Sequence, residues 1–149
     1  MAATAALAAR LGGLLRTGDV VALYGGLGAG KTAFARALIQ SLQAPLGIVE
    51  EVPSPTFSLV QQYQIGGLDL WHFDLYRLGG PDETYELGME EAFAAGVSLI
   101  EWPERLGPLL PVDRLEIYLE FPPDAGIEEC RRLVRLAGYG GWAKRMQNV

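Results

Sequence analysis

The chain has 149 residues, of which half are apolar, and its formal net charge is −6. A chain of this length is expected to fold as one domain, residues 1–149, whose core needs no disulfide and no structural metal. Cys130 is the only cysteine, which excludes an internal disulfide, and His72 is the only histidine, which argues against a zinc site. The acidic balance, with two lysines in the chain, argues against direct binding of nucleic acid.

The amino-terminal stretch is the one segment whose composition raises the question of a membrane. Residues 1–15 are rich in Ala and Leu, but Arg10 and Arg16 interrupt and follow them, whereas a signal peptide carries its positive charge first. No apolar run approaches the ~20 residues that a membrane span requires. We therefore expect a cytoplasmic protein with no membrane contact, whose first element is an amphipathic helix over residues 7–15.

The further elements follow from apolar periodicity and from the turn residues between them. Strands are expected over residues 20–24, 57–63, 68–74, 97–101, 115–121 and 133–137. Helices are expected over residues 31–42, 82–87, 89–94 and 141–146, the second of them capped by Asp82. Hairpins at 57–74 and 115–137, added to alternating strands and helices, predict an α/β fold with a mixed rather than a purely parallel sheet.

Residues 25–32, GGLGAGKT, match the phosphate-binding motif G-x-x-x-x-G-K-S/T. Its glycines let the backbone wrap a phosphate, its amides point inward, and the following helix adds a positive N-terminal end. Because an apolar strand precedes the loop and a helix follows it, we expect a three-layer P-loop NTPase fold rather than an ordinary glycine-rich turn. Lys31 would hold the β- and γ-phosphates of ATP, and the Thr32 hydroxyl would bind Mg²⁺. The residues expected to bind the nucleotide are Gly25, Gly28, Ala29, Gly30, Lys31, Thr32, Ala33 and Trp102.

Two acidic residues, Asp74 and Glu101, stand where an apolar strand ends. Such strand ends face the ligand crevice, so either carboxylate is a candidate for binding Mg²⁺ or for supporting hydrolysis. The alternative is a carboxylate that caps the strand or pairs with an arginine. Thr56 lies in a proline-rich loop, where its hydroxyl either senses the γ-phosphate or belongs to an ordinary turn.

Several other residues have a functional and a plainer interpretation. His72 could be a base but is more simply packed, Trp102 could stack on the nucleotide or on a partner, and Arg77 could neutralise phosphate or form a surface salt bridge. Cys130 is most simply a packed residue. The one basic cluster indicates a solvated strand face and contains Arg131, Arg132 and Arg135.

The sequence also bears on the class of nucleotide-binding protein. The guanine-reading N-K-x-D segment of GTPases is missing, since the only asparagine is Asn148, so GTP is disfavoured. An ATPase that acts on another protein fits the short chain best. A small-molecule kinase and a non-catalytic, nucleotide-dependent scaffold remain as alternatives.

Four blocks occur in one order along residues 18–104: LYGGLGAGKT at 23–32, VPSPTF at 52–57, HFDLYR at 72–77 and IEWPE at 100–104. Together they resemble the bacterial TsaE family, also called YjeE. The resemblance implies an ATPase, with ATP and Mg²⁺ as cofactors, that is required for N6-threonylcarbamoyladenosine next to the tRNA anticodon. It implies TsaD and TsaB as protein partners, which the ATPase resets between turnovers, and contact with tRNA only through their complex.

The resemblance also implies roles for single residues. It makes Glu101 a Mg²⁺ ligand beside Thr32, places Thr56 in a switch-like loop, and makes Trp102 a neighbour of the nucleotide. The expected catalytic residues for hydrolysis are Asp74, Glu101 and Thr56. An adenine contact is expected from the first helix, near Thr4. Gly26 stands where relatives often have Asp or Asn, so a polar contact from that position is expected to be absent.

Overall fold

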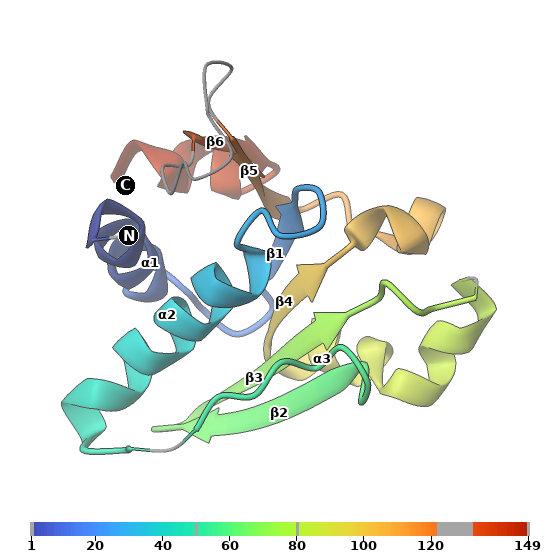
Figure 1. The fold of residues 1–149 in the computed structure, drawn as a ribbon, viewed down its shortest axis with the longest axis horizontal. Helices are drawn as coiled ribbons and strands as arrows, with labels where there is room; N and C mark the ends of the chain where they lie inside the picture. Colours follow the sequence, from blue (N-terminus) through green and yellow to red (C-terminus); the bar gives the residue numbers. More distant parts are fainter. Residues whose placement is uncertain (1, 50, 80, 122–132, 149) are drawn as a thin grey trace.

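The computed structural model describes residues 2–49, 51–79, 81–121 and 133–148. Within these ranges one sheet contains six strands in the order β2-β3-β4-β1-β5-β6 (Figure 1). Four central strands run parallel, β2 pairs antiparallel with β3, and β6 pairs antiparallel with β5. The strands are β1 (Val20–Tyr24), β2 (Val60–Ile65), β3 (Leu68–Asp74), β4 (Val97–Glu101), β5 (Arg114–Glu120) and β6 (Leu133–Tyr139). The expected α/β fold with a mixed sheet is confirmed.

Helices cover both faces of this sheet and give three layers. Alternation along the buried strands sends Val21 and Leu23 of β1 to one core and Val20 to the other. The first core contains side chains of α1 (Ala2–Gly12), α2 (Lys31–Gln43) and α4 (Trp142–Arg145). The second contains side chains of α3 (Met89–Ala95) and of two 3₁₀ helices, Pro81–Leu87 and Pro103–Leu109. Two shorter 3₁₀ turns span Ala44–Leu46 and Met146–Asn148.

The first helix ends earlier than residue 15. Gly12 and Gly13 follow its last turn, and the amides of Leu14 and Leu15 bond three residues back, to Leu11 and Gly12, as in a turn. Glycine favours helix termination because it loses more backbone entropy than other residues in a helix. Leu14 and Leu15 still pack against the first core, so the periodic apolar signal continued beyond the helix that it predicted.

The strand expected at residue 57 begins at Val60 instead. Leu59 has a left-handed backbone, with φ of 69°, and its amide donates to the carbonyl of Pro55 at 2.6 Å, which closes a turn. Phe57, expected in the strand, is 82% exposed. Residues 51–59 therefore form a longer loop than predicted, and Thr56 lies within it.

Other expected elements agree with the structure to within two residues at each end. The Pro103–Leu109 helix was not expected. Cys130, Arg131, Arg132 and the link at 122–126 lie outside the described residues. None of the helices in the described ranges is both long enough and apolar enough to cross a membrane.

The carboxyl-terminal helix is tied to the start of β1. The Arg145 guanidinium donates to both carboxylate oxygens of Asp19, at 2.7 and 2.9 Å, and to the carbonyl of Leu14. It also lies 3.9 Å from the ring centroid of Trp142. Because Asp19 directly precedes β1, this contact fixes the beginning of the strand that leads into the glycine-rich loop at residues 25–30.

A buried carboxylate joins β5 to the end of β1. Glu116 accepts hydrogen bonds from the Tyr118 hydroxyl at 2.6 Å, the Arg114 Nε at 2.8 Å and the Tyr24 hydroxyl at 3.2 Å. Burial raises the pKa of Glu116, but the hydrogen bonds from Tyr118 and Arg114 outweigh it, so the pKa lies below its ordinary value. The hydrogen bond to Glu116 and burial together raise the pKa of Tyr118 to about 12.

Candidate functional site

The site lies at the carboxyl edge of the parallel strands. Asp74 ends β3 and Glu101 ends β4, and the two residues are register partners on neighbouring strands. Leu23 of β1 is the partner of Glu101 on the other side, and β1 then runs into the loop at residues 25–30. Parallel pairing therefore brings together two acidic residues and a glycine-rich loop that are far apart in sequence.

The loop needs glycine at positions where its backbone turns. Gly25 has φ of 156°, and a Cβ there would lie 2.8 Å from the carbonyl oxygen of Leu119. Gly28 and Gly30 also have positive φ, of 76° and 100°. Gly30 precedes α2, and no side chain caps that helix end, so the first amides of α2 remain available to an anion.

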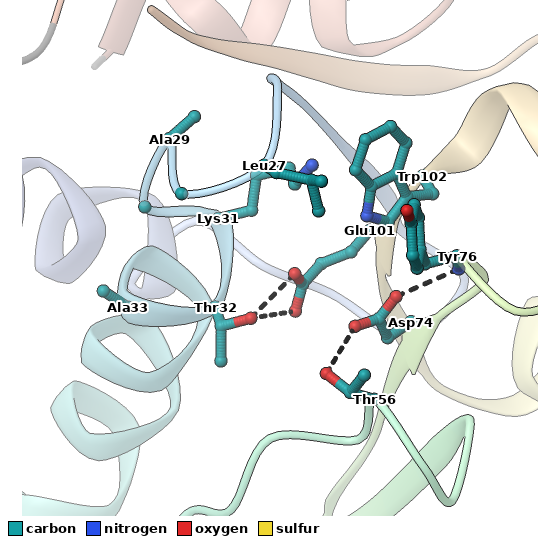
Figure 2. A pocket seen from close by; sticks show the side chains of 12 residues that line it. Leu27, Ala29, Lys31, Thr32, Ala33, Thr56, Asp74, Tyr76, Glu101 and Trp102 are labelled. Atoms are coloured by element: carbon teal, nitrogen blue, oxygen red, sulfur yellow. Dashed lines mark hydrogen bonds between the residues drawn. The ribbon is translucent and has the colours of Figure 1, made fainter. Parts of the chain in front are cut away.

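A cavity of about 290 Å³ opens between the loop, α2 and the strand ends (Figure 2). It contains all the predicted site residues except Gly25, and it adds Leu27 and Tyr76, which the sequence did not indicate. The lining residues are Leu27, Gly28, Ala29, Gly30, Lys31, Thr32, Ala33, Thr56, Asp74, Tyr76, Glu101 and Trp102.

Both carboxylates in this cavity are held by hydrogen bonds. The Thr32 hydroxyl lies 2.8 and 3.0 Å from the two carboxylate oxygens of Glu101. Asp74 accepts from the Thr56 hydroxyl at 3.0 Å and from the Tyr76 amide at 3.0 Å (Figure 2). The Thr56 hydroxyl also lies 2.7 Å from that of Ser54, so this loop is anchored to the end of β3 through one carboxylate.

Lys31 points along the loop toward Trp102. Its ammonium group donates to the carbonyl of Gly25 and lies 3.5 Å from the ring centroid of Trp102. Burial lowers the pKa of Lys31, while the negative charges of Glu101 and other nearby carboxylates oppose the shift. Trp102 has a left-handed backbone, with φ of 58°, and its ring packs at 5.0 Å against that of Tyr76. The two rings form one wall of the cavity.

The donor set fits a metal that is bound together with phosphate. In the described ranges, no group of three or more His, Cys, Asp or Glu side chains could hold a metal ion alone. Mg²⁺ in nucleotide sites needs only one or two protein ligands, because phosphates and water complete its coordination. The adjacent oxygens of Thr32 and Glu101 meet this requirement.

The family model described as threonylcarbamoyl adenosine biosynthesis protein TsaE matches residues 1–128. The chain belongs to the TsaE family. The resemblance that four short blocks indicated is thereby confirmed.

Curated relatives and a solved structure of similar fold extend this result. A protein of Rickettsia felis is 44% identical over 130 residues, which are 87% of this chain and 71% of that protein. A Bacillus subtilis protein is 40% identical over 118 residues, or 78% of this chain and 71% of its own. Both are named tRNA threonylcarbamoyladenosine biosynthesis protein TsaE. The crystal structure of YdiB from Bacillus subtilis matches with a TM-score of 0.70 at 31% identity, covering 97% of this chain and 83% of YdiB.

In this member of the TsaE family, His72 and Arg77, like Gly25, lie outside the cavity lining. His72 is fully buried beneath it and contacts Glu101. The Arg77 guanidinium instead lies 4.4 Å from the ring centroid of the exposed Phe57. The side chain of Thr4, the expected adenine contact, is outside what the structure describes. Tyr76 was missed because only the fold shows that its ring reaches Trp102.

Proposed function

We propose that this chain binds Mg-ATP and hydrolyses it in support of N6-threonylcarbamoyladenosine formation on tRNA. The observation that carries the proposal is the hydrogen bond between Thr32, at the head of α2, and Glu101, at the end of β4. It joins a phosphate-binding helix end to an acidic strand end, which is the pairing that a nucleotide-bound Mg²⁺ requires. Membership of the TsaE family supports the role in tRNA modification.

Most residues of the cavity have a role in this proposal. The amides at residues 28–33 and the Lys31 ammonium group bind the phosphates, and Trp102 packs beside the nucleotide. Thr32 and Glu101 hold the Mg²⁺, which supplies positive charge against the phosphate oxygens. Asp74 accepts a hydrogen bond from the attacking water and so orients it toward the γ-phosphate, while Thr56 brings the 51–59 loop onto Asp74.

The proposed partners are TsaD and TsaB, with ATP turnover resetting their complex between cycles in the cytoplasm. The net charge of −6 supports contact with a protein rather than directly with tRNA. In this arrangement tRNA meets the chain only through the complex.

Calorimetry and phosphate release test the proposal. ATP is titrated into the pure protein at millimolar Mg²⁺, and phosphate release is then followed with and without TsaB and TsaD. We expect binding of ATP and a faster release of phosphate with the partners. Lys31→Ala should abolish binding, whereas Lys144→Ala, which changes the other, exposed lysine of the chain, should have no effect.

Other outcomes would contradict the proposal in different ways. Absence of ATP binding in every condition would exclude a nucleotide site. Binding without turnover, even with the partners present, would favour a scaffold. Phosphate that appears on an acceptor metabolite would favour a small-molecule kinase.

A further inference from the structure

His72 makes one polar contact that the proposed mechanism does not use. Its side chain is fully buried on β3, and its Nε2 lies 2.7 Å from Oε2 of Glu101. An ionised carboxylate only accepts hydrogen bonds, so Nε2 carries the hydrogen and donates it. The other ring nitrogen, Nδ1, has no hydrogen-bond partner among the described residues. The contact with Glu101 is therefore what offsets the cost of burying the imidazole.

The sheet places this histidine where it can act on Glu101 alone. Its register partner on β4 is Leu99, two residues before Glu101, so alternation puts all three side chains on the α2 face. Asp74 is two residues after His72 and lies on the same face, but its oxygens accept from Thr56 and the Tyr76 amide. The imidazole thus supports one carboxylate from beneath and leaves the other to the loop.

The two oxygens of Glu101 have different surroundings. Oε2 accepts from His72 at 2.7 Å and lies 3.0 Å from the Thr32 hydroxyl. Oε1 is the nearer of the two to that hydroxyl, at 2.8 Å, and no contact with the imidazole is formed there. Because each carboxylate oxygen has two lone pairs, Oε1 keeps capacity for a further ligand while Oε2 is engaged.

We infer that His72 is a positioning residue that holds Oε2 of Glu101 and so turns Oε1 toward Thr32 and the bound cation. The inference rests on the proposed Mg-ATP site and adds a supporting residue below it. His72 does not touch nucleotide or metal in this arrangement. Its effect is to keep the carboxylate in one rotamer, which lowers the cost of ordering it when the cation binds.

The test is the Mg²⁺ dependence of ATP binding, measured by calorimetry. His72→Leu removes the donor and keeps a buried apolar side chain. We expect it to raise the Mg²⁺ concentration for half-maximal ATP binding about 10- to 100-fold, as the loss of a side chain that orients a metal ligand commonly does. Binding of ATP in excess EDTA should stay at the wild-type level, because the loop and α2 hold the phosphates. His72→Gln, whose amide can reach the position of Nε2, should restore most of the Mg²⁺ affinity.

Controls separate this role from a structural one. Ser98→Ala removes a buried hydroxyl on β4 that has no hydrogen-bond partner among the described residues, and it should leave the Mg²⁺ dependence unchanged. Thermal unfolding of each nucleotide-free variant reports on the fold. If His72→Leu does not fold, His72→Asn, whose amide is too short to reach Glu101, is compared with His72→Gln instead.

Three results would overturn the inference. An unchanged Mg²⁺ requirement in His72→Leu, with wild-type binding intact, would remove the proposed role while leaving the nucleotide site in place. An equal loss of ATP affinity with and without Mg²⁺ would show a structural role. Equal behaviour of the Gln and Asn variants would show that reach to Glu101 is irrelevant. Failure of the wild-type protein to bind Mg-ATP is the separate outcome that refutes the proposed function.

Discussion

The hydroxyl of Thr56 is the side-chain contact that joins the 51–59 loop to the carboxylate of Asp74, and Thr56→Val removes it with little change in shape while the backbone hydrogen bond from Asp74 to Leu59 remains. The hydroxyl donates to Asp74 at 3.0 Å. A hydrogen bond to a charged group contributes about 1.5–3 kcal/mol, and Thr56 is only half-buried, so the lower end of that range applies. If this bond orders the loop during hydrolysis, the rate should fall about tenfold, since 1.36 kcal/mol of barrier corresponds to a factor of ten.

The assay is phosphate release at saturating Mg-ATP in the presence of TsaB and TsaD, with the ATP dissociation constant measured separately. The affinity should stay near the wild-type value, because the Thr56 hydroxyl bonds to Ser54 and Asp74 and to no residue of the glycine-rich loop. Thr56→Ser keeps the hydroxyl and should retain most of the rate. A wild-type rate in Thr56→Val would refute the reasoning, and so would an equal loss of affinity and rate, which would indicate general damage to the site.

Three further predictions concern stability and the phosphate loop. Arg145→Met should lower the free energy of unfolding in urea by about 2–3 kcal/mol, and a double-mutant cycle with Asp19→Asn should give a coupling of about 1 kcal/mol; additive effects would contradict the contact. Gly25→Ala should reduce ATP affinity and the melting temperature, because the added Cβ would lie against the backbone of β5. Gly26→Ala should change neither quantity, because a Cβ added there would meet no atom within 4 Å. The lowered pKa of Glu116 means that its ionised form stabilises the fold above the ordinary value of 4.5, and this stability is lost as the pH falls through the lowered value. The melting temperature of Glu116→Gln should therefore be below wild type at pH 7, with the difference closing in acid; a constant difference would contradict it.

The strands and the glycine-rich loop between β1 and α2 could be predicted because their signals are local. The apolar run of β1, the glycines after it and Lys31 form one continuous pattern, and Asp74 and Glu101 each end a strand. That these two carboxylates are register partners on neighbouring strands is known from the structure alone. The roles of these residues in nucleotide chemistry remain predictions.

Features that depend on contacts between distant segments could not be predicted in the same way. The position of His72 beneath Glu101 depends on the β3–β4 register, which no local pattern contains. The left-handed backbone at Leu59 delays the start of β2 to Val60, although Leu is disfavoured in that conformation on steric grounds. The Pro103–Leu109 helix was missed because its two prolines and Gly107 are residue types that usually mark a turn or the end of a helix. In the structure Gly107 does have a non-helical backbone.

The tight turn between β2 and β3 offers an attachment point for measurements on the intact protein. Gly66 and Gly67 are exposed there, and a side chain added at Gly67 would meet no atom within 4 Å. The turn precedes β3, whose seven residues end at Asp74, so it is separated from the cavity by the length of a strand, about 20 Å. A fluorescent domain or affinity tag inserted at this turn would report on assembly from the opposite edge of the sheet and leave the cavity open.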